Sequence, residues 1–402
     1  MPHDTGLMAT VAVGLTAAFA AALIVMRIGL PPIVGYLLAG VAIGPFTPGF
    51  VADAALAPQL AEIGVILLLF GVGIHFSPGD LLAVRGIALP GAVGQITFTT
   101  LVGLGAASLW GWTTGEGLVF GLALSVASTV VLLRALEARD EVQTGAGRTA
   151  IGWLLAQDLA MVMVLVLLPI FAGQLGGVTA GDGEVDLLPT LASTFGKIAA
   201  FALLMLVVGA RFIPWLLRQV RGMGSRELFV LAVLATALGI AYGGAEIFGI
   251  SFALGAFVAG LVVGQSETGH DAEVEIAPLR DAFLVLFFVS VGMLVDPAFL
   301  FDAPGQIALV VAIIVLGNGL AALTLVTMLR GQRRTALTVA AGLTQIGEFS
   351  FIVAQVGRSL DLLPVEGYNL ILAGALVSIT FNPVVFRSAD MLAARRSIPA
   401  AG

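Results

Sequence analysis

Long apolar runs, separated by short polar and charged stretches, recur from one end of the chain to the other. A helix needs roughly 20 apolar residues to cross the ~30 Å hydrocarbon core of a bilayer, and most of these runs approach that length. The pattern therefore predicts an all-α polytopic membrane protein. About 13 spans are expected, near residues 7–27, 30–44, 60–76, 87–110, 116–137, 149–172, 190–217, 227–243, 248–264, 278–295, 305–329, 335–357 and 367–387.

Composition agrees with a membrane location. Hydrophobic residues make up 59% of the 402 residues and charged residues only 11%, and the mean hydropathy is +1.08. A soluble domain of this size needs far more polar surface. The absence of cysteine excludes disulfides and thiolate metal sites, three scattered histidines argue against a structural zinc, and the net charge of −7 gives no footprint for nucleic acid. The first apolar run lacks the charged start and the cleavage site of a signal peptide, so we expect it to remain as a span.

The distribution of basic residues predicts the orientation. If the N-terminus lies outside, 16 of the 18 Lys and Arg fall on inner loops or the C-terminal tail, and only Lys197 and Arg358 fall outside. Positive residues concentrate on the cytoplasmic side of membrane proteins. We therefore expect a multi-pass protein of the cell (inner or plasma) membrane, with its N-terminus outside and its C-terminus in the cytoplasm. The inner set is Arg27, Arg85, Arg134, Arg139, Arg148, Arg211, Arg218, Arg221, Arg226, Arg280, Arg330, Arg333, Arg334, Arg387, Arg395 and Arg396.

Glycines four residues apart place small faces on three predicted spans: Gly40 with Gly44, Gly239 with Gly243, and Gly260 with Gly264. Small faces let helix backbones approach closely in lipid. Such faces serve either general packing of the bundle or a specific dimer contact.

Asp158 is the most conspicuous polar residue within a predicted span. It follows Gln157 in IGWLLAQDLAMVMVLVLLP, a span without Lys or Arg. An ionisable side chain at mid-membrane costs ~2.5–3.5 kcal/mol on insertion scales and commonly marks an ion pathway. The structural alternative is a carboxylate that hydrogen-bonds to a neighbouring helix.

Two other spans contain polar clusters at their centres. The span 116–137 carries Ser125, Ser128 and Thr129, which either contact another helix or satisfy backbone groups where the helix loosens. The span 335–357 carries four polar or glycine residues within five positions, which predicts a broken helix. They are Thr344, Gln345, Gly347 and Glu348. Glu348 either titrates or caps the end of a half-helix.

These two spans occupy equivalent places in the chain. Each is the middle member of a triplet of spans, the fourth to sixth and the eleventh to thirteenth. The first triplet starts on the inner side of the membrane and the second on the outer side. Such inverted repeats bring two discontinuous helices together at the midplane, where their ends direct partial charges at an ion. Asp158 would lie beside that crossing.

Five stretches resemble the membrane transport domain of the Kef-type branch of the monovalent cation:proton antiporter-2 family, and its YbaL-type members in particular. They are GVGIHFS (71–77), ASTVVLLRALEAR (127–139), AIGWLLAQDLAMV (150–162), LFFVSVGM (286–293) and RTALTVAAGLTQIGEFSFI (334–352). They occur in family order, and the resemblance runs essentially from end to end.

The resemblance implies an NhaA-like fold in which residues 1–402 form a single transmembrane transport unit. A core, about 87–172 and 305–387, would contain two crossed, unwound helices. A scaffold, about the first to third and eighth to tenth spans, would form a homodimer. The implied activity is exchange of K⁺ (preferred) or Na⁺ for H⁺ by an elevator-like movement, with no cofactor.

Site residues follow from the same resemblance, position by position. Gln157 and Asp158 match a Gln-Asp signature, and Asp158 would hold the transported cation transiently. The first crossing helix supplies Ser125, Ser128 and Thr129, and the second supplies Gln345, Gly347 and Glu348, with Thr344 beside them.

Two features depart from the family pattern. Relatives often have Lys where Asn318 stands, so Asn318 is either the site of a lost counter-charge or an ordinary interhelical hydrogen-bonding residue. The sequence also stops about 15 residues after the last predicted span, before any cytosolic regulatory domain of the kind that Kef and YbaL chains carry.

A single carboxylate that binds either a proton or a metal ion is enough to couple opposite fluxes. Gln157, Ser/Thr hydroxyls and freed carbonyls would replace the water of the ion, and one carboxylate favours one-for-one exchange unless Glu348 also titrates. The alternatives are a proton-independent K⁺ efflux channel and an intramembrane enzyme, for which His75 is the only plausible base. The predicted oxygen ligands do not distinguish K⁺ from Na⁺, because both ions bind oxygen.

Overall fold

The computed structural model describes residues 6–48, 56–75, 78–178, 187–250 and 252–394, and every regular element in these ranges is helical. Eight of the described helices are long and apolar enough to cross a membrane, and four apolar helices are shorter. The prediction of an all-helical, multi-span membrane protein is confirmed.

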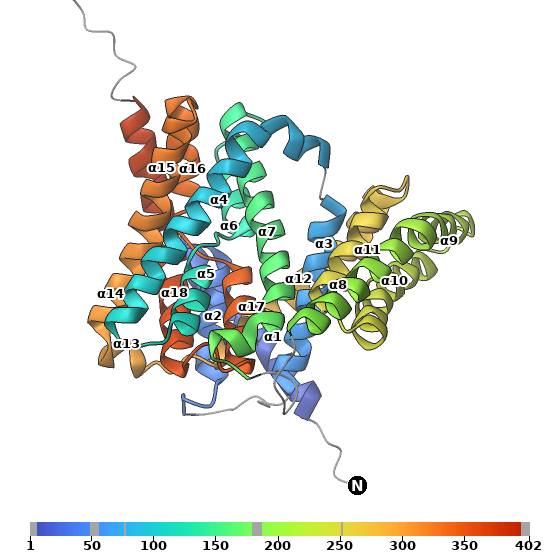
Figure 1. Cartoon of the computed structure of the whole chain (residues 1–402), viewed down its shortest axis with the longest axis horizontal. Helices are drawn as coiled ribbons and strands as arrows, with labels where there is room; N and C mark the ends of the chain where they lie inside the picture. The colour runs from blue at the N-terminus through green and yellow to red at the C-terminus, as the bar shows by residue number, and fades with distance from the viewer. Residues whose placement is uncertain (1–5, 49–55, 76–77, 179–186, 251, 395–402) are drawn as a thin grey trace, which may run out of the picture. The chain divides into compact units, whose positions relative to one another are not determined.

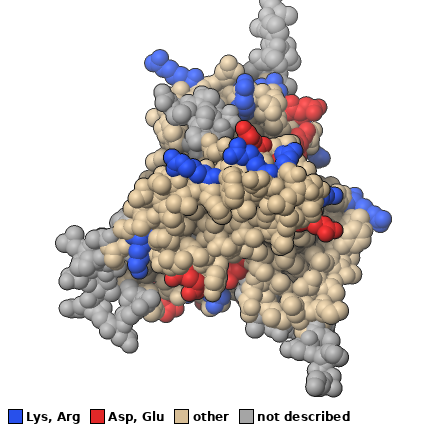
Figure 2. Space-filling model, turned by 90° about the vertical axis from the view of Figure 1, so that its right-hand side faces the viewer, with Lys and Arg blue, Asp and Glu red and all other residues tan. Residues whose placement is uncertain are grey.

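Its surface agrees with that conclusion. On the face in Figure 2, most of the described atoms belong to residues other than Lys, Arg, Asp and Glu, and charged residues gather in small groups. Large apolar side chains remain exposed, such as Leu206 at 69% and Phe212 at 52%. Lipid tails can cover such side chains at no hydrophobic cost.

The chain forms two compact units. Unit 1 comprises residues 1–21, 36–77 and 181–293, and unit 2 comprises residues 22–35, 78–180 and 294–402. Helices α1 (Gly6–Arg27) and α2 (Pro32–Ile43) contribute to both. The other helices of unit 1 are α3 (Leu56–His75), α8 (Leu187–Leu204), α9 (Ala210–Gly222), α10 (Arg226–Phe248), α11 (Phe252–Gly264) and α12 (Gly269–Met293), with a π-helical turn at Met205–Gly209.

Glycine faces pack the helices of unit 1. A Cβ on Gly260 of α11 would overlap the backbone of Phe70 on α3, and one on Gly40 of α2 would overlap that of Val289 on α12. Gly239 and Gly243 differ, because a Cβ on either would meet nothing within 4 Å. Two of the three glycine faces therefore serve helix packing within the chain.

Unit 2 brings together two distant parts of the sequence. Helix α4 packs against α15, α7 packs against α16, and α16 packs against α18 (Figure 1). Its helices are α4 (Pro78–Leu109), α5 (Thr114–Leu124), α6 (Thr129–Glu137), α7 (Gly145–Phe171), α13 (Phe299–Asp302), α14 (Pro304–Ala312), α15 (Gly319–Met328), α16 (Arg333–Gly342), α17 (Glu348–Ser359) and α18 (Val365–Ala394), with a 3₁₀ turn at Ala172–Leu175.

Two interruptions divide helices of unit 2. The first separates α5 from α6 at residues 125–128, and the second separates α16 from α17 at residues 343–347. Both coincide with the polar clusters that the sequence singles out. Small polar residues can satisfy the backbone groups that a helix break frees, which is why these positions tolerate the interruption.

A third irregularity lies between α14 and α15, where Ile313–Asn318 form a π-helical segment. The wider turn inserts an extra residue and changes the face on which later side chains lie. Asn318 is the last residue of this segment and is 1% exposed.

Candidate functional site

The two helix breaks contact each other. The side chain of Gln345 holds both backbone groups of Ser128: its Oε1 accepts from the Ser128 N–H at 3.1 Å, and its Nε2 donates to the Ser128 carbonyl at 3.1 Å. The N–H of Gly347 and the hydroxyl of Ser350 donate to the Val126 carbonyl, at 3.3 and 3.2 Å. Each break thereby satisfies backbone groups that the other leaves open.

Gly347 is required for this contact. A Cβ at this position would overlap the Cα and Cβ of Ser128. Its φ of −130° is accessible to other residues, so the requirement comes from the close approach of two backbones rather than from the local conformation.

Asp158 projects from α7 toward the first break. It is 2% exposed. Its Oδ2 accepts a hydrogen bond of 3.0 Å from the Thr129 hydroxyl at the start of α6. Its Oδ1 is buried and has no hydrogen-bond partner among the described residues. No ion pair within the described ranges includes Asp158. A buried carboxylate oxygen without a partner is costly, unless a proton or a cation occupies it.

Glu348 is a second buried carboxylate, 3% exposed, at the first position of α17. Its Oε2 accepts from the Ser128 hydroxyl at 3.1 Å. The position at a helix start suits the capping interpretation, since the N-terminal end of a helix attracts negative charge. The contact with Ser128 links Glu348 to the first break as well.

Gln157 contacts the other end of the first break. Its Oε1 accepts from the Ala127 N–H at 3.2 Å, and its Nε2 donates to the Ser125 carbonyl at 3.2 Å. Its Nε2 also donates to Oε1 of Gln95 on α4. The adjacent residues Gln157 and Asp158 therefore both contact the segment 125–129.

Asn318 extends these amide contacts. Its Nδ2 donates to the Leu124 carbonyl at 2.9 Å, and its Oδ1 accepts from Gln95 Nε2 at 2.7 Å and from the Thr99 hydroxyl at 2.6 Å. The sequence leaves two interpretations of Asn318, the site of a lost counter-charge or an interhelical hydrogen-bonding residue. These contacts are those of an interhelical hydrogen-bonding residue.

Gln95 and Thr99 do not follow from sequence reasoning, although both are 0% exposed. A signal exists in the spacing: the two residues are four positions apart in the middle of a predicted span, so they share one helix face. A polar pair on one face of an apolar span predicts a buried contact rather than a lipid-facing one.

Thr344 serves the second break. Its hydroxyl donates to the Ala341 carbonyl at 2.8 Å and accepts from Asn382 Nδ2 on α18 at 3.1 Å. The structure therefore brings the sequence-predicted site residues together around the two breaks of unit 2, and three groups of contacts, besides those of Thr344 and Gly347, hold them. Thr129 holds Asp158; Ser128 holds Glu348 and Gln345; the amides hold the carbonyls at the end of α5.

Most carbonyls of the first break already accept hydrogen bonds. Those of Ser125 and Ser128 accept from side-chain amides, as does that of Leu124 at the end of α5, and that of Val126 accepts from the second break. Oδ1 of Asp158, by contrast, is buried and accepts no hydrogen bond from the described residues.

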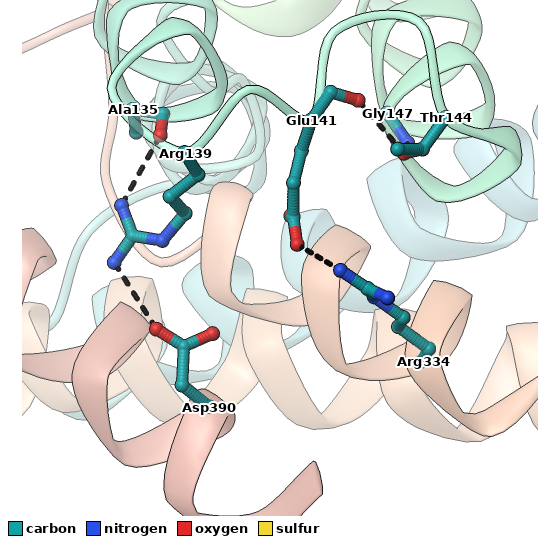
Figure 3. A network of polar contacts seen from close by, with 7 residues as sticks. All are labelled: Ala135, Arg139, Glu141, Thr144, Gly147, Arg334 and Asp390. Carbon is teal, nitrogen blue, oxygen red and sulfur yellow. Dashed lines mark hydrogen bonds and ion pairs between the residues drawn. The ribbon is translucent and has the colours of Figure 1, made fainter. Parts of the chain in front are cut away.

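Two ion pairs lie near the ends of α6 and α16 that are farthest along the chain from the breaks. Arg334 at the start of α16 donates to Glu141, which follows α6, at 2.7 Å, and Arg139 pairs with Asp390 of α18 at 3.5 Å (Figure 3). A surface pocket of about 420 Å³ lies here, lined in part by Glu141, Arg334 and Asp390. The hydrogen bond to Glu141, and then its charge, raise the pKa of Arg334. The Arg334–Glu141 pair joins the start of α16 to the segment after α6, and the Arg139–Asp390 pair joins that segment to α18.

Other chemistries find little support in the described ranges. No three His, Cys, Asp or Glu side chains there cluster as metal ligands. His75 ends α3, is half-exposed, and pairs with Glu273 of α12 at 2.7 Å. That position suits a surface ion pair rather than a buried catalytic base.

Comparison with known proteins identifies the family. The family model described as "Sodium/hydrogen exchanger, transmembrane" matches residues 14–388. The putative cation/proton antiporter YbaL of Escherichia coli K12 is 54% identical over 387 residues, covering 96% of this chain and 69% of that protein. The K(+) efflux antiporter 4 of Arabidopsis thaliana is 32% identical over 362 residues, covering 89% of this chain and 60% of that protein. The chain thus spans about two thirds of the length of these relatives.

Solved structures agree in fold. The sodium proton antiporter MjNhaP1 from Methanocaldococcus jannaschii, at pH 8, superimposes with a TM-score of 0.66 at 16% identity, covering 96% of this chain and 99% of that one. Because the named relatives are antiporters, the prediction that this chain is not an enzyme is confirmed, as is the resemblance to the antiporter-2 family. The chain belongs to the sodium/hydrogen exchanger family of membrane transport proteins.

Proposed function

We propose that this protein exchanges a monovalent cation for a proton across the cell membrane, and that the carboxylate of Asp158 binds the two in turn. Family membership and the antiporter names of its relatives support exchange as the activity. The observation that carries the assignment of the site is the buried Oδ1 of Asp158, which has no partner in the described part of the chain.

Competition at this carboxylate couples the two fluxes. The ionised carboxylate attracts a cation, whose lost water is replaced by Oδ1 and neighbouring oxygens such as the Thr129 hydroxyl. The protonated carboxylate has no charge with which to hold the ion. Because the site cannot carry both, each passage across the membrane exchanges one for the other.

The surroundings of Asp158 favour one-for-one exchange. Gln157, Gln95 and Asn318 are neutral amides, so they add no titrating charge. Glu348 keeps its hydrogen bond to Ser128 throughout the cycle in this proposal. K⁺ is the preferred cation, with Na⁺ as the alternative.

We propose a corresponding architecture for the two units. The broken helices of unit 2 form the crossing of two inverted repeats in a transport core that moves in an elevator-like manner, and unit 1 contains most of the scaffold for a homodimer. The chain crosses the membrane 13 times, with its N-terminus outside, as the basic residues suggest.

The test is cation flux driven by a pH gradient in proteoliposomes. Asp158→Asn keeps the shape of the side chain and one oxygen that can accept from Thr129, but it cannot bind a proton and a cation in turn. We expect this variant to fold, as judged by gel filtration and thermal melting, and to lose exchange. Exchange retained by Asp158→Asn would refute the site. Cation flux through the unaltered protein without proton countermovement would indicate a channel.

A further inference from the structure

The Ser125 carbonyl, which the first break frees from the helix, accepts two amide hydrogen bonds. Gln95 Nε2 donates to it at 3.0 Å and Gln157 Nε2 at 3.2 Å. A carbonyl oxygen has two lone pairs, so both are engaged. This oxygen cannot ligate a cation unless at least one amide withdraws.

Gln95 is the hub of these contacts. Its Nε2 has two hydrogens and three neighbouring acceptors, of which Asn318 Oδ1 at 2.7 Å and Ser125 O at 3.0 Å are nearer than Thr99 Oγ1 at 3.3 Å. Its Oε1 accepts from Gln157. Gln95 therefore holds the Ser125 carbonyl directly and orients the second amide that holds it.

The same segment of chain reaches the carboxylate. Ser125 begins the break, and Thr129, at its other end, donates to Asp158 Oδ2. Gln157 precedes Asp158 and touches both Ser125 and Ala127. The Ser125 carbonyl and the proposed cation site are thus joined by one segment of five consecutive residues, 125–129.

We propose that Gln95 is a positioning residue that sets the affinity for the transported cation, by competing with the ion for the Ser125 carbonyl. An N–H donor and a metal ion compete for the same lone pairs. The cation therefore binds at the expense of an amide hydrogen bond, and the returning amide favours its release. This inference rests on the proposed exchange at Asp158.

A purely structural role for Gln95 predicts the opposite change in cation affinity when Gln95 is replaced. If Gln95 only supported the fold, its removal would loosen the site and weaken cation binding. If it withholds an ion ligand, its removal frees that ligand, so binding tightens while release slows.

The test compares Gln95→Met, which keeps the volume and removes the amide, with the unaltered protein. K⁺ and Na⁺ binding to purified protein is measured by calorimetry, and exchange is measured in proteoliposomes. We expect Kd and KM to fall about fivefold, the factor that corresponds to one net hydrogen bond of ~1 kcal/mol, and kcat to fall as well. Thr99→Val is the matched control, because Thr99 contacts Gln95 and Asn318 but not the Ser125 carbonyl; its Kd should not fall.

Gln95→Asn provides a second variant in case Gln95→Met does not fold. It keeps a polar amide in the network but shortens the side chain, which draws the amide away from Ser125, so Kd should fall here too. An unchanged or raised Kd in the folded variants overturns the inference. Failure of the unaltered protein to bind either cation would instead contradict the proposed function, so the two failures are distinguishable.

Discussion

The hydroxyl of Thr129 donates to one oxygen of the Asp158 carboxylate across 3.0 Å, while the other oxygen of that carboxylate is buried without a described partner. One half of the side chain is thereby fixed in orientation, and the other half is left for an incoming ion. Thr129 is the first residue of α6, directly after the break, so the geometry of the broken helix determines where the carboxylate points.

Thr129→Val removes this donor and keeps the shape of the side chain. The ionised carboxylate then loses a charge-assisted hydrogen bond of about 1.5 kcal/mol or more, so we expect the cation KM at fixed pH to rise about tenfold. Exchange assays over a range of K⁺ and Na⁺ concentrations measure this. Thr129→Ser keeps the hydroxyl and should retain a near-normal KM; equal KM values for the two variants would show that the hydrogen bond has no role.

The pH dependence follows from competition for one carboxylate. As pH falls, more of the carboxylate is protonated, so more cation is needed to displace the proton. We expect the cation KM to rise with falling pH, approaching about tenfold per unit, while the rate at saturating cation changes little. Initial exchange rates at several pH values separate the two parameters. A KM independent of pH would contradict competition.

Glu348→Gln tests whether the second carboxylate takes part in the cycle. The amide can still contact the Ser128 hydroxyl but cannot exchange a proton. We expect exchange to persist, with no net charge moved per cycle, as measured by the effect of a clamped membrane potential on the flux. Loss of exchange in a well-folded Glu348→Gln protein, or a change in its response to potential, would place Glu348 in the proton cycle.

Gly347→Ala tests the contact between the two breaks. The added Cβ would overlap Ser128, and overpacking of this kind costs typically 1–3 kcal/mol. We expect a lower melting temperature and reduced exchange. Gly239→Ala is the matched control on α10, because a Cβ there meets nothing within 4 Å and alanine favours a helix by roughly 0.5–1 kcal/mol. A Gly347→Ala protein as stable as this control would show that the breaks do not pack as closely as described.

Sequence reasoning succeeds where a polar residue is conspicuous against an apolar background. Asp158 lies in an apolar span where a lipid-facing carboxylate would be costly, so it predicts a buried site. Gln345 and Gly347 lie close together at the centre of another span, so they predict a helix break. Both breaks lie in unit 2, where the sequence places the polar clusters. The all-helical membrane fold follows from the same contrast.

The partners of these residues are harder to predict, because they depend on helix rotation. Gln95 reaches Asn318 across more than 200 positions of sequence, and the π-helical segment at Ile313–Asn318 affects where Asn318 points. The letters IIVLGN give no sign that the helix widens there. For the same reason, the sequence does not indicate that side-chain amides occupy the carbonyls at the end of α5.

Proton release by purified protein on addition of K⁺ or Na⁺ tests competition at Asp158 most directly. In a weakly buffered detergent solution, the unaltered protein should release one proton for each cation bound, and Asp158→Asn should release none. Cation binding without proton release, or undiminished release by Asp158→Asn, would contradict the exchange of a proton for a cation at this carboxylate.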